Sequence, residues 1–234
     1  MRNLDNPGRD ISKARTNLLY IGLTLMLMGY LMVWLPGPSA GLRIIGIELG
    51  EWIKFLGVGA GRNWFYLPPI VVGLVLAMLT FNWSNRHPGT WVARGMAIAV
   101  AMLSFPAIAA IQLEPRSEWL GRVMAIGLVI VVAAVAALFA NRRPANGWVW
   151  LIIAGVSMVG LIAPTFQYLA VRPVVEAALQ QQVGIGMGVW LNVAGALIVA
   201  LVALVEFISA TQTKRTAATQ AAALENQFAE KQRG

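Results

Sequence analysis

Outside the C-terminal tail, six glutamates are the residues of this sequence that offer the most chemistry. Five of them lie in polar stretches between long apolar runs: Glu48, Glu51, Glu114, Glu118 and Glu176. Carboxylates that lie close together can bind a cation or act as general acid and general base. The same stretches also contain Arg116, Arg122 and Arg172. Ion pairs at a membrane surface are therefore the first expectation, and a binding or catalytic site is the alternative.

Glu206 differs from the other five because it lies inside the last apolar run, eight residues before Lys214. An ionisable group inside a membrane segment is by default a functional candidate. Glu206 could hold a proton or an ion, although proton relays usually use several such groups. We therefore expect its carboxylate to reach the membrane surface or to pair with an arginine near the end of the span.

Asn192 and two glycine-rich stretches are the weaker candidates. Asn192 lies in the last apolar run, where it is expected to hydrogen-bond to a neighbouring helix. Gly184 and Gly188 are four residues apart, a spacing that lets two helices approach closely. The stretches "GVGAG" at 57–61 and "GIGMG" at 184–188 fall on the same predicted side as the five glutamates. Together with these glutamates they could shape a pocket.

The sequence also excludes several kinds of site. It contains no cysteine, and its one histidine is His87. Thiolate nucleophiles, disulfides and cysteine-ligated metal sites are therefore excluded, and one chain cannot form a histidine cluster around a metal. No Ser-His-Asp set, H-E-x-x-H motif or nucleotide-binding signature occurs. We expect no catalytic residue, no metal and no cofactor.

The elements that position these residues are predicted to be apolar helices. The chain is 58% hydrophobic and 12% charged, whereas soluble domains carry about 25% charged residues. A helix needs about 20 apolar residues to cross a bilayer. Six stretches qualify: 17–35, 64–83, 91–113, 119–140, 148–171 and 188–210. The sequence predicts an all-α, polytopic membrane bundle of six transmembrane helices that forms one domain, residues 1–210.

Two further segments lie outside these spans. Residues 41–57 place apolar side chains on one arc of a helix and four charged side chains on the opposite arc. This pattern predicts an amphipathic helix that lies on the outer membrane face or packs over the mouth of the bundle. Residues 211–234 are alanine-rich with mixed charge, which favours a partly helical cytoplasmic tail.

The positive residues predict the orientation of the chain. With a cytoplasmic N-terminus, twelve of the eighteen Lys and Arg residues fall on the cytoplasmic side, the side where these residues are usually in excess. The net charge of +8 is then explained by topology and by contacts with anionic lipid headgroups, with no nucleic acid as a partner. We expect a multi-pass protein of a bacterial-type inner or plasma membrane, with both termini cytoplasmic.

A short polar motif suggests an internal repeat. Asn-Arg-x-Pro occurs at 85–88 and again at 141–144, each time between two predicted spans. At a similar offset, Pro106 matches Pro164, and Pro115 and Glu118 match Pro173 and Glu176. The hypothesis is that the second and third spans and the fourth and fifth spans are a parallel duplication, related by an axis along the membrane normal.

The sequence leaves three functions open. The first is a non-enzymatic subunit or scaffold of a membrane assembly, with the lipid bilayer and a membrane protein or a second copy as its partners. The alternative is a small permease for a neutral or apolar solute. The second alternative is an enzyme that modifies lipid at the outer face and uses the carboxylates there.

Overall fold

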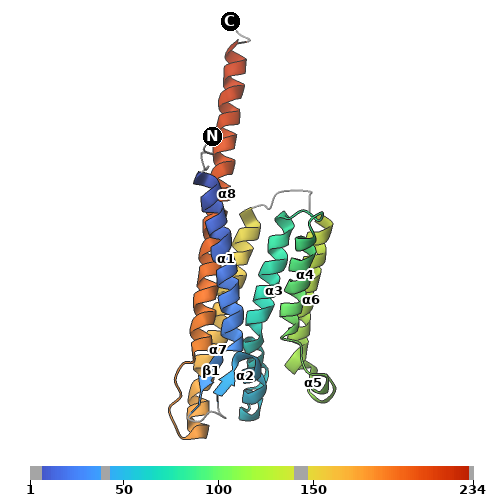
Figure 1. Cartoon of the computed structure of the whole chain (residues 1–234), viewed down its shortest axis with the longest axis vertical. Helices are drawn as coiled ribbons and strands as arrows, with labels where there is room; N and C mark the ends of the chain where they lie inside the picture. Colours follow the sequence, from blue (N-terminus) through green and yellow to red (C-terminus); the bar gives the residue numbers. More distant parts are fainter. Residues whose placement is uncertain (1–6, 38–42, 140–146, 232–234) are drawn as a thin grey trace, which may run out of the picture.

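The computed structural model describes residues 7–37, 43–139 and 147–231. The chain is mostly helical, 84%, and its long helices run side by side (Figure 1). The start of α1 and the C-terminal part of α8 lie at one end of the bundle, which we call the terminal end (Figure 1). The opposite end, which we call the loop end, carries α2, the strands and α5.

The helices and strands follow in chain order. The long helices are α1 (Pro7–Leu31), α3 (Leu67–Leu79), α4 (Pro88–Met102), α6 (Arg116–Phe139), α7 (Gly147–Leu179) and α8 (Met187–Lys231). The short ones are α2 (Gly46–Trp52), η2 (Ile53–Leu56), η3 (Gly59–Tyr66), η4 (Thr80–Asn82) and α5 (Ile108–Leu113). The strands are β1 (Val33–Pro36) and β2 (Arg43–Ile45).

Four helical stretches of the described residues are long and apolar enough to cross a membrane. They are 61–82, 116–139, 147–179 and 187–213, and they coincide with the predicted spans 64–83, 119–140, 148–171 and 188–210. Four such helices indicate an integral membrane protein. The other two predicted spans are not confirmed as crossings.

The two remaining spans differ from the prediction for local reasons. The predicted span 17–35 extends too far, because α1 ends at Leu31 and the chain continues as β1. The first turns of α1 also carry Arg15, Thr16 and Asn17, which lower its apolar character. The predicted span 91–113 is broken, because α4 ends at Met102 and α5 begins only at Ile108. Pro106 lies in this break, and proline disfavours helical backbone at the residue before it.

α3 is the central helix of the bundle. In the most apolar part of the candidate span 61–82, which contains α3, 72% of the residues are buried, against 28–33% in the corresponding parts of the other three candidate spans. It packs against α1, α4, α6 and α7, and Val71, Val72 and Val75 lie in the main apolar core. The other long helices therefore surround α3 and direct much of their apolar surface outward, as expected where lipid is the solvent.

A seam of small residues joins α1 and α8, which run antiparallel. Gly22 of α1 faces Gly195 of α8, and Gly29 of α1 faces Gly188 of α8. On each helix the two glycines are seven residues apart, or about two helical turns. A Cβ atom on Gly195 would lie 2.6 Å from the backbone nitrogen of Met26. Helices in lipid gain much of their packing energy from such close approach. Gly184 lies outside this seam, since its Cβ would meet only Pro36, at 3.7 Å.

A two-stranded sheet corrects the all-α prediction. β1 pairs antiparallel with β2, with Val33 opposite Ile45 and Pro36 opposite Arg43. Trp34 is fully buried here, and its indole N–H donates to the carbonyl of Gly29 over 2.8 Å. The strands satisfy backbone groups where the chain leaves α1, in a place where proline prevents helix continuation.

The predicted amphipathic segment 41–57 is divided into β2, α2 and η2. Leu49 and Ile53 are almost completely buried against Trp34, Phe65 and Val175. The sequence left two arrangements open, one on the membrane face and one over the mouth of the bundle. In the structure the segment packs over the loop end of the bundle. Its apolar arc contacts protein there, so the description as an interfacial helix is not confirmed.

The duplication hypothesis is not confirmed by the described residues. The second Asn-Arg-x-Pro motif, 141–144, lies outside them. The matched prolines occupy different settings, because Pro106 lies in the break after α4 whereas Pro164 lies inside the continuous helix α7. Similarly, Pro115 precedes α6, whereas Pro173 lies within α7.

The glycine seam generates a first prediction. Gly195→Ala adds one Cβ atom where only backbone can yield, so it should destabilise the fold by about 1–3 kcal/mol, the usual cost of overpacking. Thermal unfolding in detergent, followed by tryptophan fluorescence, measures the effect. Gly155→Ala is the matched control, because its Cβ meets nothing within 4 Å and alanine favours helix. Equal melting temperatures for the two variants would contradict a contribution of the glycine seam to stability.

Candidate functional site

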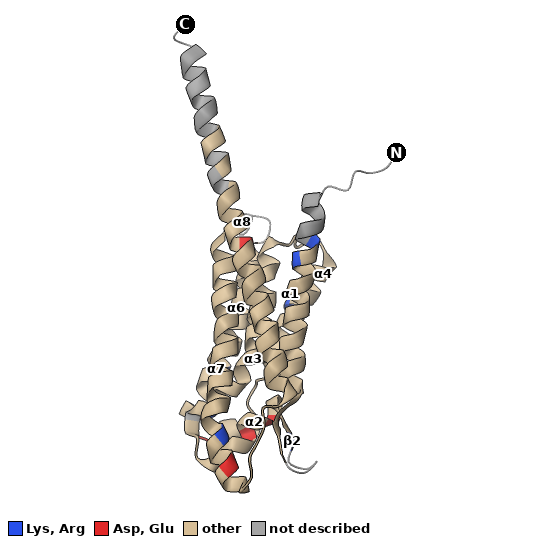
Figure 2. Cartoon of the chain, turned by 90° about the vertical axis from the view of Figure 1, so that its left-hand side faces the viewer, with Lys and Arg blue, Asp and Glu red and all other residues tan. Residues whose placement is uncertain are grey.

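Charged residues gather at the two ends of the bundle, and its middle is nearly free of them (Figure 2). At the loop end, six of these residues form one network: Glu51, Lys54, Arg62, Glu114, Glu118 and Arg122. We call this set the ionic network. It contains three carboxylates and three cations, so its formal charges balance.

Arg62 is the centre of the ionic network. It lies in η3, directly before α3, and only 2% of its side chain is exposed. Its guanidinium contacts Glu114 and lies 3.3 Å from Glu118 and 3.5 Å from Glu51. A buried guanidinium is always charged and needs such partners. Arg62 therefore links the segment before α3 to α2 and to the residues on either side of the start of α6.

Glu51 connects the remaining members of the ionic network. Its carboxylate accepts a 2.6 Å hydrogen bond from the hydroxyl of Tyr66 and lies 3.2 Å from the Lys54 ammonium. The Glu51–Lys54 contact joins side chains about one helical turn apart. Partial burial alone would raise the pKa of Glu51, but the hydrogen bonds from Tyr66 and Lys54 and the charge of Arg62 together lower it. Glu51 is therefore an ionised acceptor at neutral pH.

Arg122 is the least compensated member of the ionic network. It lies in α6, is 3% exposed, and stacks over the Tyr66 ring with 4.1 Å to the ring centroid. Its ion pair is with Glu51, at 3.5 Å. Its Nε and second terminal nitrogen (Nη2) are buried without a hydrogen-bond partner in the described structure. Arg122 also lines a cavity of about 440 Å³ between η3, α3 and α6.

The remaining candidates at the loop end form no ion pair with the ionic network in the described structure. Glu48 is exposed in α2 and lines an open groove with Arg43 and Lys54. Glu176 lies in α7, where it pairs with Arg172 at 3.0 Å and accepts a hydrogen bond from the backbone N–H of Val183, also at 3.0 Å. Glu176 thus fixes the turn between α7 and α8. The five glutamates expected from the sequence do not form one site.

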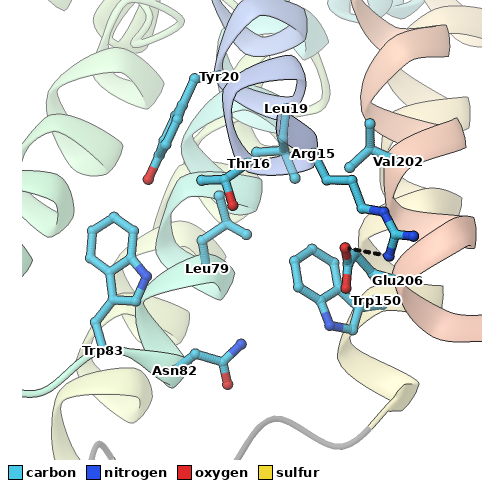
Figure 3. Close-up of a pocket in the computed structure, with 10 residues that line it drawn as sticks. All are labelled: Arg15, Thr16, Leu19, Tyr20, Leu79, Asn82, Trp83, Trp150, Val202 and Glu206. Carbon is cyan, nitrogen blue, oxygen red and sulfur yellow. Dashed lines mark hydrogen bonds and ion pairs between the residues drawn. The ribbon is translucent and has the colours of Figure 1, made fainter. Parts of the chain in front are cut away.

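Glu206 pairs with an arginine at the terminal end, one of the two arrangements expected from the sequence. Its carboxylate lies 3.3 Å from the guanidinium of Arg15 in α1, which also donates to Ser209 over 3.2 Å. Figure 3 shows the pair at one side of a small cavity, about 160 Å³, that also exposes Trp83 and Trp150. The ion pair joins α1 to α8 beyond the glycine seam.

Asn192 is fully buried inside the bundle. Its amide nitrogen donates to the Gly160 carbonyl of α7 over 3.2 Å, while its side-chain oxygen has no partner in the described structure. Its backbone lies against Gly29. The residue therefore bridges α8 to α7, which is the helix-to-helix role expected for it.

The sequence interpretation missed three buried arginines. Arg62 was not singled out as a candidate, although it is the most buried cation of the described chain. Glu206 was singled out among ionisable residues within the spans, but Arg94 and Arg122 also fall inside the predicted spans 91–113 and 119–140. A charge inside an apolar run is a signal that could have identified both.

Arg94 fixes the terminal end of α4. It is 3% exposed and donates to the Asn85 side chain over 2.8 Å and to the Ala136 carbonyl over 3.1 Å. Asn85 donates in turn to the Ala137 carbonyl over 2.7 Å. The first Asn-Arg-x-Pro motif therefore has a structural use, because its asparagine connects α4 to the end of α6.

The chemistry available at the ionic network is charge compensation. Glu51, Glu114 and Glu118 each contact a cation, so their negative charges are compensated within the protein. Among the described residues, no group of three or more His, Cys, Asp or Glu side chains is arranged to hold a metal ion. Arg122 is the member of the network that keeps two buried nitrogens without a hydrogen-bond partner in the described structure.

Comparison with known proteins gives no further assignment. No protein-family model matches the chain, and no curated protein or solved structure is significantly similar to it. The candidate site is therefore described from its own geometry.

The ionic network generates a second prediction. Arg62→Leu leaves three carboxylates without their shared cation, so we expect a loss of about 3–5 kcal/mol, as measured when one partner of a buried ion pair is removed. Urea unfolding in mild detergent tests this loss. Arg116→Leu is the control, because Arg116 is exposed at the start of α6. If both substitutions cost the same, Arg62 does not hold the loop end together.

Proposed function

We propose that this protein crosses a bacterial-type cell membrane six times, with both termini cytoplasmic, and serves as a non-enzymatic subunit or scaffold of a membrane assembly. The observation that carries the proposal is the internal pairing of its candidate site residues. Glu51, Glu118 and Glu206 contact arginines, and Glu176 pairs with Arg172. Polar groups used in this way hold helices together and favour a structural role.

The length of α8 adds support for a role in an assembly. This helix has 45 residues, or about 68 Å at 1.5 Å per residue, whereas a bilayer core is about 30 Å thick. The part beyond Thr213 projects past the other helices at the terminal end (Figure 1). A continuous helix outside the bundle offers an attachment point for a cytoplasmic partner or a second copy.

The arrangement of the helices supports six crossings. α1 and α4 lie alongside the four apolar helices in Figure 1, and α1 packs along α8 while α4 packs against α3 and α6. Two helices packed parallel to membrane spans are most simply placed in the same bilayer. The alternating directions then bring both termini to one side, the side that the positive residues mark as cytoplasmic.

The alternatives receive less support from the geometry. The cavity near Glu206 and the cavity near Arg122 lie at opposite ends of the bundle. The apolar core around α3 separates the two cavities, so they do not outline a permeation route. Four of the five carboxylates at the loop end, Glu51, Glu114, Glu118 and Glu176, are paired with cations, which disfavours a lipid-modifying reaction that depends on them.

The six-crossing arrangement predicts where single cysteines react. The natural chain has no cysteine, so exposed positions can be labelled one at a time with a membrane-impermeant maleimide. Cysteines replacing Phe55, Ser117 and Gln182 should react in intact cells, and those replacing Ala14, His87 and Thr213 only after permeabilisation. Reaction of the His87 and Ser117 positions from the same side would remove α4 as a crossing.

The assembly role predicts a complex of defined stoichiometry. Mass measurement in mild detergent should give a mass above that of one 25.2 kDa chain, and truncation after Thr213 should reduce it. As the matched control, the tail is replaced by a helical sequence of equal length and composition but different order, which should also lose the partner. A monomer for the full-length chain would contradict the assembly role, and retention by both variants would assign attachment to the membrane-facing helices.

A further inference from the structure

We propose that the cavity between η3, α3 and α6 binds an anionic lipid, whose acidic headgroup pairs with Arg122 and whose chain lies against the apolar wall. The cavity has a volume of about 440 Å³, within the range of about 300–1,000 Å³ usual for ligand sites. This proposed lipid site does not depend on the scaffold role proposed above.

The charge distribution in the ionic network leaves Arg122 short of a partner. Arg62 has three carboxylates around it: Glu51, Glu114 and Glu118. Besides its stacking on the Tyr66 ring, Arg122 has one ion pair among the described residues, with Glu51 at 3.5 Å. Glu51 is shared with Lys54, Arg62 and the Tyr66 hydroxyl. A guanidinium that is 97% buried with one long, shared ion pair is undercompensated. An additional anion would complete its pairing.

The free nitrogens of Arg122 have the geometry for an acidic headgroup. Nε and Nη2 are the two without partners, and their N–H groups form one edge of the planar guanidinium. That edge presents two parallel donors, the fork that binds a carboxylate or phosphate through two oxygens. Asn63 lines the same cavity, and its buried side-chain oxygen also lacks a partner. This oxygen can accept a hydrogen bond from a hydroxyl of a glycerol headgroup.

The rest of the cavity is suited to a hydrocarbon chain. Leu67, Ile70 and Ala125 line it from α3 and α6. Trp64, which is 47% exposed, borders it near the start of the apolar span 61–82. Tryptophan at this depth is typical of the membrane interface, where lipid headgroups lie. The guanidinium and the apolar wall therefore match the order of headgroup and chain in an anionic lipid.

The test is lipid binding by the full-length protein in detergent, measured by native mass spectrometry. Phosphatidylglycerol and phosphatidylcholine are titrated separately, and inorganic phosphate is titrated alone as a chain-free anion. We expect one tightly bound phosphatidylglycerol, and about tenfold weaker binding of phosphatidylcholine. Arg122→Gln should reduce phosphatidylglycerol binding about tenfold, whereas Arg116→Gln should leave it unchanged.

A second variant keeps Arg122 and fills the cavity. Gly121→Leu places a side chain where a Cβ meets nothing within 4 Å, so the fold tolerates it while the cavity loses volume. It should abolish the tight phosphatidylglycerol, and Gly127→Leu, equally unhindered on α6 but outside the cavity lining, should not. Unchanged binding in Gly121→Leu, or equal binding of the two lipids, would overturn the proposal. Binding of inorganic phosphate as tightly as phosphatidylglycerol would assign a free anion instead of a lipid.

Discussion

The burial of Arg62 is the constraint on which the loop end of this protein depends. Its positive charge cannot be removed at any physiological pH, so carboxylates must reach it from several segments. Glu51 comes from α2, Glu114 from the end of α5 and Glu118 from α6. The long connection before α3 is thereby fastened across the bundle. The same connection is also covered by apolar packing around Trp34, so charge and packing act on the same elements.

The other end of the bundle is held by different means. Among the described residues Arg94 pairs with no carboxylate and instead donates to Thr80, Asn85 and the carbonyl of Ala136. Glu206 and Arg15 join the first and last long helices there. Between the two ends, the Gly22–Gly195 and Gly29–Gly188 contacts bring α1 and α8 together. Because lipid gives little hydrophobic drive for helix association, these polar contacts and close approaches supply the specificity.

The pairing of charged residues within the protein bears on its function. A protein whose carboxylates compensate its own arginines has few polar groups left for catalysis or transport, which favours an assembly role. Arg122 is the exception, because two of its nitrogens are unpaired beside a cavity with an apolar wall. A bound lipid there would add a counter-charge to the ionic network. Lipid binding and loop-end stability should then be linked, since a ligand that binds the folded form stabilises it.

The sequence alone determined the class of the protein. Hydrophobic content and apolar run length predicted six membrane helices, because bilayer thickness fixes the number of residues a crossing helix needs, and four of them are long and apolar enough in the described structure. It also identified the possibility that Glu206 pairs with an arginine, since a lone charge in lipid is costly.

Only the tertiary structure decided which charges meet and where helices end. Arg62 and Glu118 are 56 residues apart, and the pairing of Gly22 with Gly195 depends on the approach of the first and last helices. The unpaired edge of Arg122 likewise depends on neighbours distant in sequence. The local sequence pattern indicates whether a segment faces lipid, water or protein. Which side chain pairs with which depends on how the helices pack in the bundle.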